Sequence, residues 1–301
     1  MTLAPQLEPV PAAPDEGTAG ARVRRGRGRG ERQRSGLALG RISGVSLGVV
    51  TLWISLLVLL PLAAVVGKAF GSGWSDFTDA ITSSATASAL KLTLGLAAAV
   101  AVVNAVMGTL VAWVLVRERF RGAGLLETVI DIPFALPTVV AGIVVLALYG
   151  QNSPVGVTLY GERAGLVVAL LFVTLPFTVR TVQPVLLDLD RDAEQAAASL
   201  GASPVVVFRR IVLPQILPAA ASGAALSFAR AIGEYGSLVF ISSGLKGNKV
   251  ASFIIYGQLQ NADTPGAATR QAAAIAFVLL LASAVVLILL DLVQRRVARR
   301  G

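Results

Sequence analysis

Six long apolar runs dominate this chain of 301 residues and restrict it to one class of fold. A helix needs about 20 apolar residues to cross roughly 30 Å of hydrocarbon, and each run approaches that length. The runs cover residues 45–67, 92–116, 132–149, 164–179, 218–243 and 271–290. A soluble domain could bury one or two such segments, but not six in a chain of this length. The sequence therefore predicts an all-α polytopic membrane protein with six transmembrane helices.

Composition and missing motifs exclude most enzymatic functions. Only 14% of the residues are charged, and the chain has no cysteine and no histidine. Disulfides, histidine catalysis and histidine metal sites are therefore excluded. The phosphate-binding GxxxxGKS/T loop is also absent from the sequence. We expect no catalytic residue, no bound metal and no cofactor in this chain, so any transport would draw its energy from a partner or from an ion gradient.

The positively charged residues lie mainly on one side of a six-span topology. Nineteen of the 26 lysines and arginines fall in the N-terminal tail, the second-to-third and fourth-to-fifth connections and the C-terminal tail. Six fall in the other loops, and Arg230 lies inside the fifth run. Loops rich in lysine and arginine stay in the cytoplasm during insertion. We therefore expect both termini and the fourth-to-fifth connection to be cytoplasmic.

Both ends of the chain are basic. Residues 1–44 are rich in proline, alanine, glycine and arginine, with a run of arginines over residues 22–34. No aromatic side chain interleaves those arginines, so the run lacks a stacking platform for bases. We expect residues 1–44 to be a disordered cytoplasmic tail that contacts anionic membrane lipid and binds no nucleic acid. The transmembrane domain is expected at residues 45–295, followed by a basic cytoplasmic tail at 296–301.

The connection between the fourth and fifth runs, residues 188–217, is too long and too polar for a simple turn. It opens with acidic residues, which complement the positive end of a helix dipole, and continues with alanines that favour helix. The acids are Asp188, Asp190, Asp192 and Glu194, and the alanines are Ala193, Ala196, Ala197 and Ala198. Leu200 and Gly201 then predict a helix stop, with Gly201 in a left-handed conformation.

A second short helix is predicted after that stop. Ser203 and Pro204 suit the N-cap and the first helical position, and residues 205–213 continue as a helix. We expect Pro214 and Pro218 to break or kink the chain where it enters the fifth span. The segment thus reads as helix, glycine turn and helix at the cytoplasmic face. It either serves as a surface connection or docks a soluble partner, and the second interpretation is favoured.

The spacing within this segment resembles the EAA loop of ABC importer permeases. The matching residues are Gln195, Ala196, Ala197, Gly201, Ile211, Leu213 and Pro214. The family usually has glutamate where this chain has Gln195, although Glu194 precedes it. The resemblance implies that this short helix, with Glu194 included, fits a cleft in a separate ATPase subunit and transmits its motion.

Two further segments extend the resemblance over residues 45–295. Residues 131–137, DIPFALP, resemble the start of the third span in sulfate and molybdate permeases. Residues 228–237, FARAIGEYGS, are similar to the fifth span of the sulfate/thiosulfate permease family of the T type. Molybdate permeases usually carry phenylalanine at the position of Tyr235.

The resemblance to the T-type family implies a type I ABC importer permease fold in the inner membrane of a bacterium. It implies a subunit that moves sulfate or thiosulfate into the cytoplasm. The implied partners are an ATPase dimer that uses ATP and Mg²⁺, a second permease of the W type in a heterodimer, and an extracytoplasmic sulfate-binding protein. An importer of molybdate, tungstate or another oxyanion is the first alternative, and a stand-alone secondary transporter is a distant one.

Charged and small residues inside the fifth run are candidates for the translocation path or its gate. Arg230 and Glu234 are four residues apart, so they face the same side of a helix and can neutralise each other. Arg230 either belongs to a structural or gating ion pair or lines the route of the anion. Gly233 and Gly236 flank Glu234 and permit close helix contacts or local unwinding, and Tyr235 lies between them.

Other polar groups and prolines within the runs have structural explanations. We expect Asp131 to be a helix-start acid near the headgroups, and Asn104 to hydrogen-bond a neighbouring helix. Prolines are expected to kink the third and fourth spans. They are Pro133, Pro137, Pro176 and Pro184. Broken helices could also aim backbone amides at an anion.

Overall fold

The computed structural model describes residues 41–118, 120–242, 249–260 and 265–298. Every regular element within these ranges is helical, which confirms the predicted all-α class. The arginine run at residues 22–34, most of the tail at 1–44, Arg119 and residues 299–301 lie outside the described residues. The predictions made for them remain predictions.

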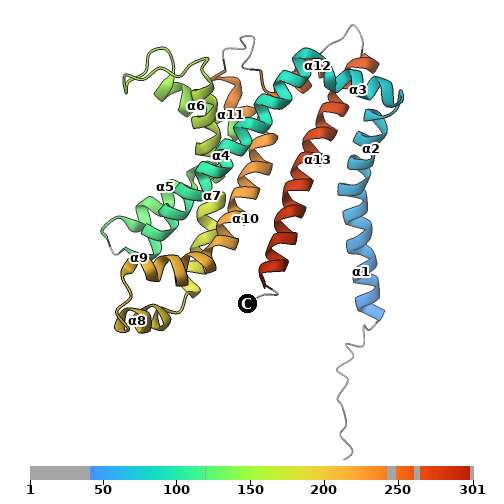
Figure 1. Cartoon of the computed structure of the whole chain (residues 1–301). Coiled ribbons are helices and arrows are strands. Elements are labelled where there is room, and N and C mark those ends of the chain that lie inside the picture. The colour runs from blue at the N-terminus through green and yellow to red at the C-terminus, as the bar shows by residue number, and fades with distance from the viewer. Residues whose placement is uncertain (1–40, 119, 243–248, 261–264, 299–301) are drawn as a thin grey trace, which may run out of the picture. The chain divides into compact units, whose positions relative to one another are not determined.

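The helices follow one another along the chain, most of them with short connections (Figure 1). Their bounds are α1 Arg41–Ile54, α2 Leu60–Ala69, α3 Trp74–Thr82, α4 Ser84–Arg117, α5 Ala123–Ala135, α6 Thr138–Tyr149, α7 Arg163–Asp188, α8 Arg191–Ser199, α9 Pro204–Val207, α10 Leu213–Ile232, α11 Gly236–Val239, α12 Ala251–Leu259 and α13 Pro265–Ala298. Two π-helical turns, Ser55–Leu59 and Phe208–Val212, join α1 to α2 and α9 to α10.

Five helical stretches of the described chain are long and apolar enough to cross a membrane. They are Gly44–Ala69, Ser84–Arg117, Arg163–Asp188, Pro204–Ile232 and Gly266–Arg296. A sixth span is obtained only if α5 and α6 count as one, because the chain bends by 118° between them. The protein is therefore a multi-pass membrane protein with five such stretches, and with six where the bent pair α5 and α6 is counted as one span.

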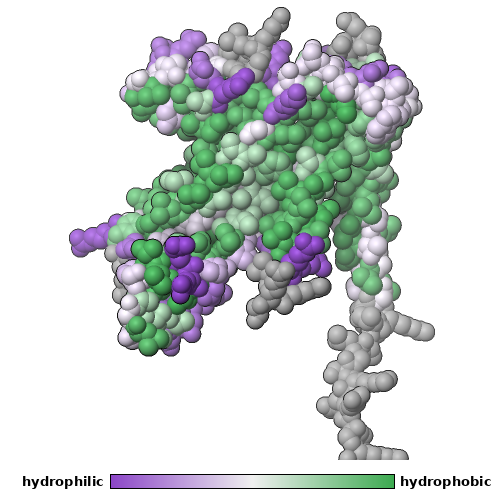
Figure 2. All heavy atoms as spheres, viewed as in Figure 1, coloured by the Kyte–Doolittle hydropathy of each residue, from purple (hydrophilic) through white to green (hydrophobic). Residues whose placement is uncertain are grey.

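The chain divides into two compact units, Met1–Thr51 and Leu52–Gly301. In the first unit, the described residues form most of α1, and the side chains from residue 44 onward are exposed. In the second unit, exposed apolar side chains cover the middle of the helices, while polar ones gather toward both ends (Figure 2). A surface that faces hydrocarbon in its middle and water at its ends requires this distribution.

Two helices of the second unit, α4 and α7, run in parallel through its core. Asn104 on α4 donates a hydrogen bond to Thr174 Oγ1 on α7 at 2.7 Å, which confirms the contact expected for Asn104. One turn farther along both helices, Gly108 lies against Thr178. Because the contacts advance together, the two helices point the same way.

The third core helix, α10, packs on α7 in the opposite direction. Ser227 Oγ donates to the Thr174 carbonyl at 3.1 Å, and Gly223, one turn earlier, lies against Thr178. A Cβ atom at Gly223 would stand 2.5 Å from Thr178 Cα, and one at Gly108 would stand 2.7 Å from Thr178 Cβ. Glycine at these two positions therefore lets α4 and α10 both close on Thr178.

The third predicted span is broken rather than kinked. α5 ends at Ala135, and Leu136 adopts an extended conformation with φ −84° and ψ 137°. A residue that precedes proline avoids the helical region because the proline ring clashes with its backbone. Pro137 then forms the N-cap of α6. The prolines of this run thus locate the distortion correctly, but the chain forms two separate helices there and not one kinked helix.

The fifth run departs from the expectation, whereas the kinks expected at Pro176 and Pro184 in the fourth run stay a prediction. Pro176 and Pro184 lie inside α7, which continues as one helix. Packing against α4 and α10 holds α7 helical although each proline removes a backbone donor. The fifth run, expected over residues 218–243, ends as a helix at Ile232 and resumes only as the short α11.

Replacing Gly108 with alanine is expected to destabilise the fold. The new methyl group would overlap Thr178 Cβ, and overpacking of this kind costs about 1–3 kcal/mol. Gly95→Ala is the matched control on the same helix, since a Cβ there meets no atom within 4 Å. The midpoint of thermal unfolding in detergent should fall for Gly108→Ala and hold or rise for Gly95→Ala. Equal midpoints for the two variants would contradict the close packing at Thr178.

Candidate functional site

The segment between α7 and α10 forms a short helix, a glycine turn and the start of a long helix. Asp190 caps α8, because its carboxylate accepts a hydrogen bond from the Asp192 amide at 2.8 Å. Gly201 follows α8 in a left-handed conformation with φ 86°. The Ala202 amide then donates back to the Ala197 carbonyl at 3.1 Å. The predicted helix stop at Gly201 is confirmed.

The second helix of this segment is longer than predicted. It starts with α9, passes through the π-helical turn and continues to the end of α10 as a stretch of 29 residues. Pro214 and Pro218 do not break this helix, and the kink that was expected as the alternative stays a prediction. In the π-helical turn the Leu213 amide donates to the Phe208 carbonyl, five residues back. This wider turn leaves room for the Pro214 ring, which would clash with a carbonyl in a regular helix.

One arginine at the end of α4 holds the segment against the helix bundle. Arg117 Nη2 pairs with Glu194 Oε1 on α8 at 2.5 Å, and the two side chains keep only 11% and 20% of their surface exposed. The guanidinium also lies over the Trp113 ring at 5.2 Å, and Trp113 meets Phe208 edge-on at 5.5 Å. From the sequence, Arg117 was counted only among the positive charges that set the membrane orientation. A basic residue in the last turn of a helix is placed to interact with groups at that helix end, and this position could have indicated a contact for Arg117.

Apolar side chains are exposed on the turn and on the second helix of the segment. Leu200 is 89% exposed and Val205 is 66% exposed, with Val206 and Phe208 at 40% and 37%. These four residues are called the loop patch below. The segment and the C-terminal end of α13 lie at the same end of the second unit (Figure 1). Contiguous exposed apolar side chains next to charged ones are typical of a surface that binds another protein.

Five of the seven predicted coupling residues lie on α8 and its turn. They are Glu194, Gln195, Ala196, Ala197 and Gly201. Glu194 faces Arg117 and Ala197 is half-buried, whereas the other three are exposed. The remaining two, Leu213 and Pro214, lie at the start of α10. Leu213 packs there against buried side chains of α4, α7 and α10, so it belongs to the core rather than to the loop surface.

The predicted translocation residues lie where α10 ends. Arg230 Nη1 pairs with Glu234 Oε2 at 2.6 Å, with 35% of the arginine side chain and 1% of the glutamate side chain exposed. The other carboxylate oxygen, Oε1, accepts a hydrogen bond from the Ser237 amide at 2.8 Å. The Glu234 carbonyl accepts one from Ser252 Oγ at 2.8 Å. The expected ion pair is present. Glu234 also accepts a hydrogen bond from a backbone amide where the helix is interrupted after Ile232.

The two glycines of the break have different surroundings. A Cβ atom at Gly236 would stand 2.3 Å from Thr138 Oγ1, so α11 lies directly on the first turn of α6. No described atom outside the adjacent chain comes within 4 Å of such a position at Gly233, where the helix unwinds. The Tyr235 ring stacks on Tyr256 of α12 at 5.0 Å. The breaks in the third and fifth spans therefore meet through α6 and α11.

A second ion-pair network, which the sequence reasoning missed, joins α5 to α7. Arg180 pairs with Asp131 through two hydrogen bonds. Its Nη1 also donates to Glu127 Oε1 and to Gln183 Oε1, both at 2.8 Å. α5 begins at Ala123, so Asp131 is not the helix-start acid that was expected. Glu127 and Asp131 are one helical turn apart, so they face the same side of a helix, and this spacing could have indicated a shared cationic partner.

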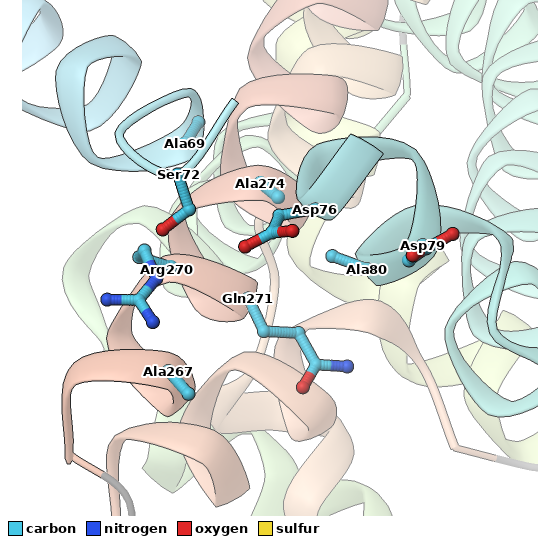
Figure 3. A pocket seen from close by; sticks show the side chains of 9 residues that line it. All are labelled: Ala69, Ser72, Asp76, Asp79, Ala80, Ala267, Arg270, Gln271 and Ala274. Carbon is cyan, nitrogen blue, oxygen red and sulfur yellow. The ribbon is translucent and has the colours of Figure 1, made fainter. Parts of the chain in front are cut away.

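A cavity of about 300 Å³ lies between α3 and α13 at the other end of the second unit (Figure 3). Its lining includes Asp76, Asp79, Arg270 and Gln271. Two carboxylates against one guanidinium give this lining a net negative charge, so it disfavours an oxyanion. Within the described part of the chain, no group of three or more residues that could hold a metal ion is found.

The sequence of this chain is similar to membrane subunits of transport systems. It matches the family model described as binding-protein-dependent transport system inner membrane component over residues 104–300. It is 39% identical over 264 residues to the sulfate transport system permease protein CysT of Salmonella typhimurium, which covers 85% of this chain and 94% of that relative. It is 40% identical over 255 residues to the protein of the same name from Synechocystis, which covers 82% and 87%.

Solved structures share the fold at low sequence identity. A chain of a bacterial alginate ABC transporter, in complex with a periplasmic protein that holds an alginate pentasaccharide, superimposes with a TM-score of 0.69 at 16% identity, over 85% of this chain and 95% of that chain. A chain of the inward-facing methionine ABC transporter MetNI superimposes with a TM-score of 0.52 at 19% identity, over 69% and 94%. The type I importer fold expected from the sequence is confirmed.

Neutralising Glu194 is expected to loosen α8 from α4. Glu194→Gln keeps the shape of the side chain but removes the charge that Arg117 faces, and a hydrogen bond to a charged group contributes about 1.5–3 kcal/mol. Amides of α8 should then exchange with deuterium on the order of tenfold faster. The control is Asp192→Asn, an exposed acid of α8 that forms no ion pair with another described residue. The same exchange rate in both variants, measured by mass spectrometry, would contradict the docking role of Arg117.

Proposed function

Since the chain belongs to the family of binding-protein-dependent transport system inner membrane components, we propose that it is a permease subunit of an ATP-driven sulfate importer. The observation that carries this proposal is the identity of 39% and 40% to sulfate transport permeases over 85% and 82% of this chain. The match covers 94% and 87% of the relatives, so it extends over the whole membrane domain rather than one motif. In this proposal the permease domain occupies residues 45–295, and thiosulfate is a second substrate.

A transport subunit of this family is not an enzyme, and ATP and Mg²⁺ are used by a separate ATPase dimer. The loop patch and α8 supply the surface on which the ATPase docks, because exposed apolar side chains surround the glycine turn there. A second permease of the W type forms the other half of a heterodimer. Exposed apolar side chains of α5 and α6, such as Leu125 and Ile143, are available for that contact. An extracytoplasmic sulfate-binding protein delivers the anion at the opposite end.

The proposed orientation follows from the same docking surface. The ATPase is cytoplasmic, so the end of the second unit that carries α8, α9 and the C-terminal end of α13 faces the cytoplasm (Figure 1). The excess of lysine and arginine on that side of the topology supports this assignment. The protein then lies in the inner membrane of a bacterium with both termini in the cytoplasm.

One continuous helix links the proposed docking surface to the proposed gate. The stretch Pro204–Ile232 has 29 residues, so it is about 43 Å long at 1.5 Å per residue. A displacement of α9 by the ATPase is carried along this helix to Arg230 and to the break at residues 233–235. Gly233 supplies the flexible point, and Gly236 keeps α11 against α6. Tyr235, stacked on α12, moves with the break.

The Arg230–Glu234 pair acts in this proposal as a latch of the gate rather than as a binding site for sulfate. The buried carboxylate lies 2.6 Å from the guanidinium and cancels its charge. A dianion gains little from an arginine that is already neutralised. Glu234 is also engaged with the backbone of α11, so opening of the pair and movement of α11 are coupled.

Comparing a variant that removes one charge of the Arg230–Glu234 pair with one that removes both tests this role. Arg230→Gln leaves the buried Glu234 without a counter-charge, which costs up to about 3–5 kcal/mol of stability. The double variant Arg230→Gln/Glu234→Gln removes both charges and should regain most of the thermal stability. Sulfate uptake should recover together with stability in the double variant. Recovery of the melting midpoint with no recovery of uptake would contradict the latch and favour direct contact of Arg230 with the anion.

Leu200→Glu is expected to detach the ATPase, because it puts a charge on the most exposed residue of the loop patch. The ATPase that co-purifies with the tagged chain should fall on the order of tenfold or more, and uptake of radiolabelled sulfate should fall with it. Val157→Glu is the matched control for ATPase recovery, which it should leave unchanged. Val157 is 49% exposed in the loop between α6 and α7, at the opposite end of the second unit (Figure 1).

The same cells separate the docking assignment from the substrate assignment. Unlabelled thiosulfate should compete with labelled sulfate, whereas molybdate at the same concentration should not. Stronger competition by molybdate would overturn the substrate and leave the docking surface intact. Normal ATPase recovery and normal uptake in Leu200→Glu would overturn the docking surface.

A further inference from the structure

A second cavity, of about 550 Å³, lies beside the N-terminal parts of α4 and α7. Its lining residues are Ser88, Lys91, Leu92, Gly95, Leu96 and Arg163, all of them described, and none is acidic. We propose that this cavity binds the phosphate group of an anionic phospholipid, with one acyl chain lying along α4. The proposal requires only that the chain spans a membrane, and it holds whichever ion is imported.

The cations of this cavity have no counter-charge among the residues that the structure describes. Neither Lys91 nor Arg163 forms an ion pair with another described residue, whereas Arg117, Arg180 and Arg230 all do. Arg163 is the first residue of α7, where the positive end of the helix dipole adds to its charge. The preceding residue, Glu162, is exposed and does not line the cavity. Two unpaired cations beside a helix N-terminus suit a tetrahedral oxyanion, which is either a phosphate ester of a lipid or a free ion.

The wall of the cavity favours the lipid over the free ion. Three lining residues are apolar, and they are Leu92, Gly95 and Leu96. Below them, α4 presents an exposed apolar stripe in line with Lys91, in which Val102 and Val106 are 66% and 64% exposed. A free sulfate ion would lose hydration against such a wall, and the wall offers it no hydrogen-bond donor in return. An acyl chain covers it without that cost while its phosphate stays with the cations.

The depth of the cations fits the headgroup region. Lys91 lies about 10 Å along α4 from Ser84, the first residue of that helix. Long basic side chains at such positions extend toward the interface and hold lipid phosphates there. The α3–α13 cavity at the same end of the second unit offers a contrast, because its Asp76 and Asp79 oppose Arg270. Arg270 is therefore a cation near the same interface whose surroundings disfavour phosphate.

The test measures lipid binding to the full chain, purified in detergent with the subunits that accompany it. Native mass spectrometry counts bound phosphatidylglycerol, and phosphatidylcholine serves as the zwitterionic comparison. Phosphatidylglycerol should bind more tightly. Lys91→Gln and Arg163→Gln should each weaken it about fivefold, and the double variant on the order of thirtyfold. Arg270→Gln, the matched control, should leave it unchanged.

Gly95→Leu provides a second test that keeps both cations. A Cβ atom at Gly95 meets no atom within 4 Å and Gly95 lines the cavity, so the leucine side chain extends into it. It should reduce phosphatidylglycerol binding, and sodium sulfate at matched ionic strength should not displace the lipid. The proposal is overturned by equal binding of the two lipids, or by wild-type binding in the double variant or in Gly95→Leu. Displacement of the lipid by sulfate would also overturn it and assign the cavity to a free oxyanion.

Discussion

Every backbone amide and carbonyl inside a bilayer must find its partner within the protein, because hydrocarbon supplies none. The described chain is therefore helical throughout its spans, and it leaves the helix only where other groups replace the lost bonds. After Ile232, the Glu234 carboxylate accepts from the Ser237 amide, and Ser252 donates to the Glu234 carbonyl. Arg230 neutralises the same carboxylate. Glu234 thus provides the contacts that a continuous helix would have provided, and the break in the fifth span depends on it.

The break in the third span depends in turn on the break in the fifth. The first turn of α6 lies against Gly236, and a Cβ at Gly142 of α6 would stand 2.8 Å from the Ser237 carbonyl oxygen. On the other side of the 118° bend, α5 is fixed to α7 by Arg180. Both halves of the broken span pack against α7, and α6 also lies on α11. Because α6 packs against both α7 and α11, the two breaks form one packed element at the proposed gate.

Contacts set by local spacing could be predicted from the sequence, and those set by topology could not. The Arg230–Glu234 pair follows from a spacing of four residues, and the stop at Gly201 follows from its sequence context. Arg117 and Glu194 are 77 residues apart, and Arg180 and Asp131 are 49 apart, so their pairing requires the order in which helices pack. The π-helical turn that carries the chain through the expected proline break has no comparable local signal. Prolines marked where the third span breaks but not the angle, because the angle is set by what α6 and α5 pack against.

The balance of fixed charge inside the bundle bears on where the proposed importer selects its substrate. The arginines of the two ion-pair networks described above, Arg180 and Arg230, are matched by three carboxylates. A dianion that enters between the helices therefore meets no net positive charge from these networks. Conduction requires that binding be weak enough for the ion to leave, and a strongly basic site would retain sulfate. Selection by a separate binding protein removes the need for such a site, so neutralised arginines can serve the gate. Lys91 and Arg163, which form no ion pair within the described residues, do not alter this balance, because a bound lipid phosphate neutralises them outside the gate.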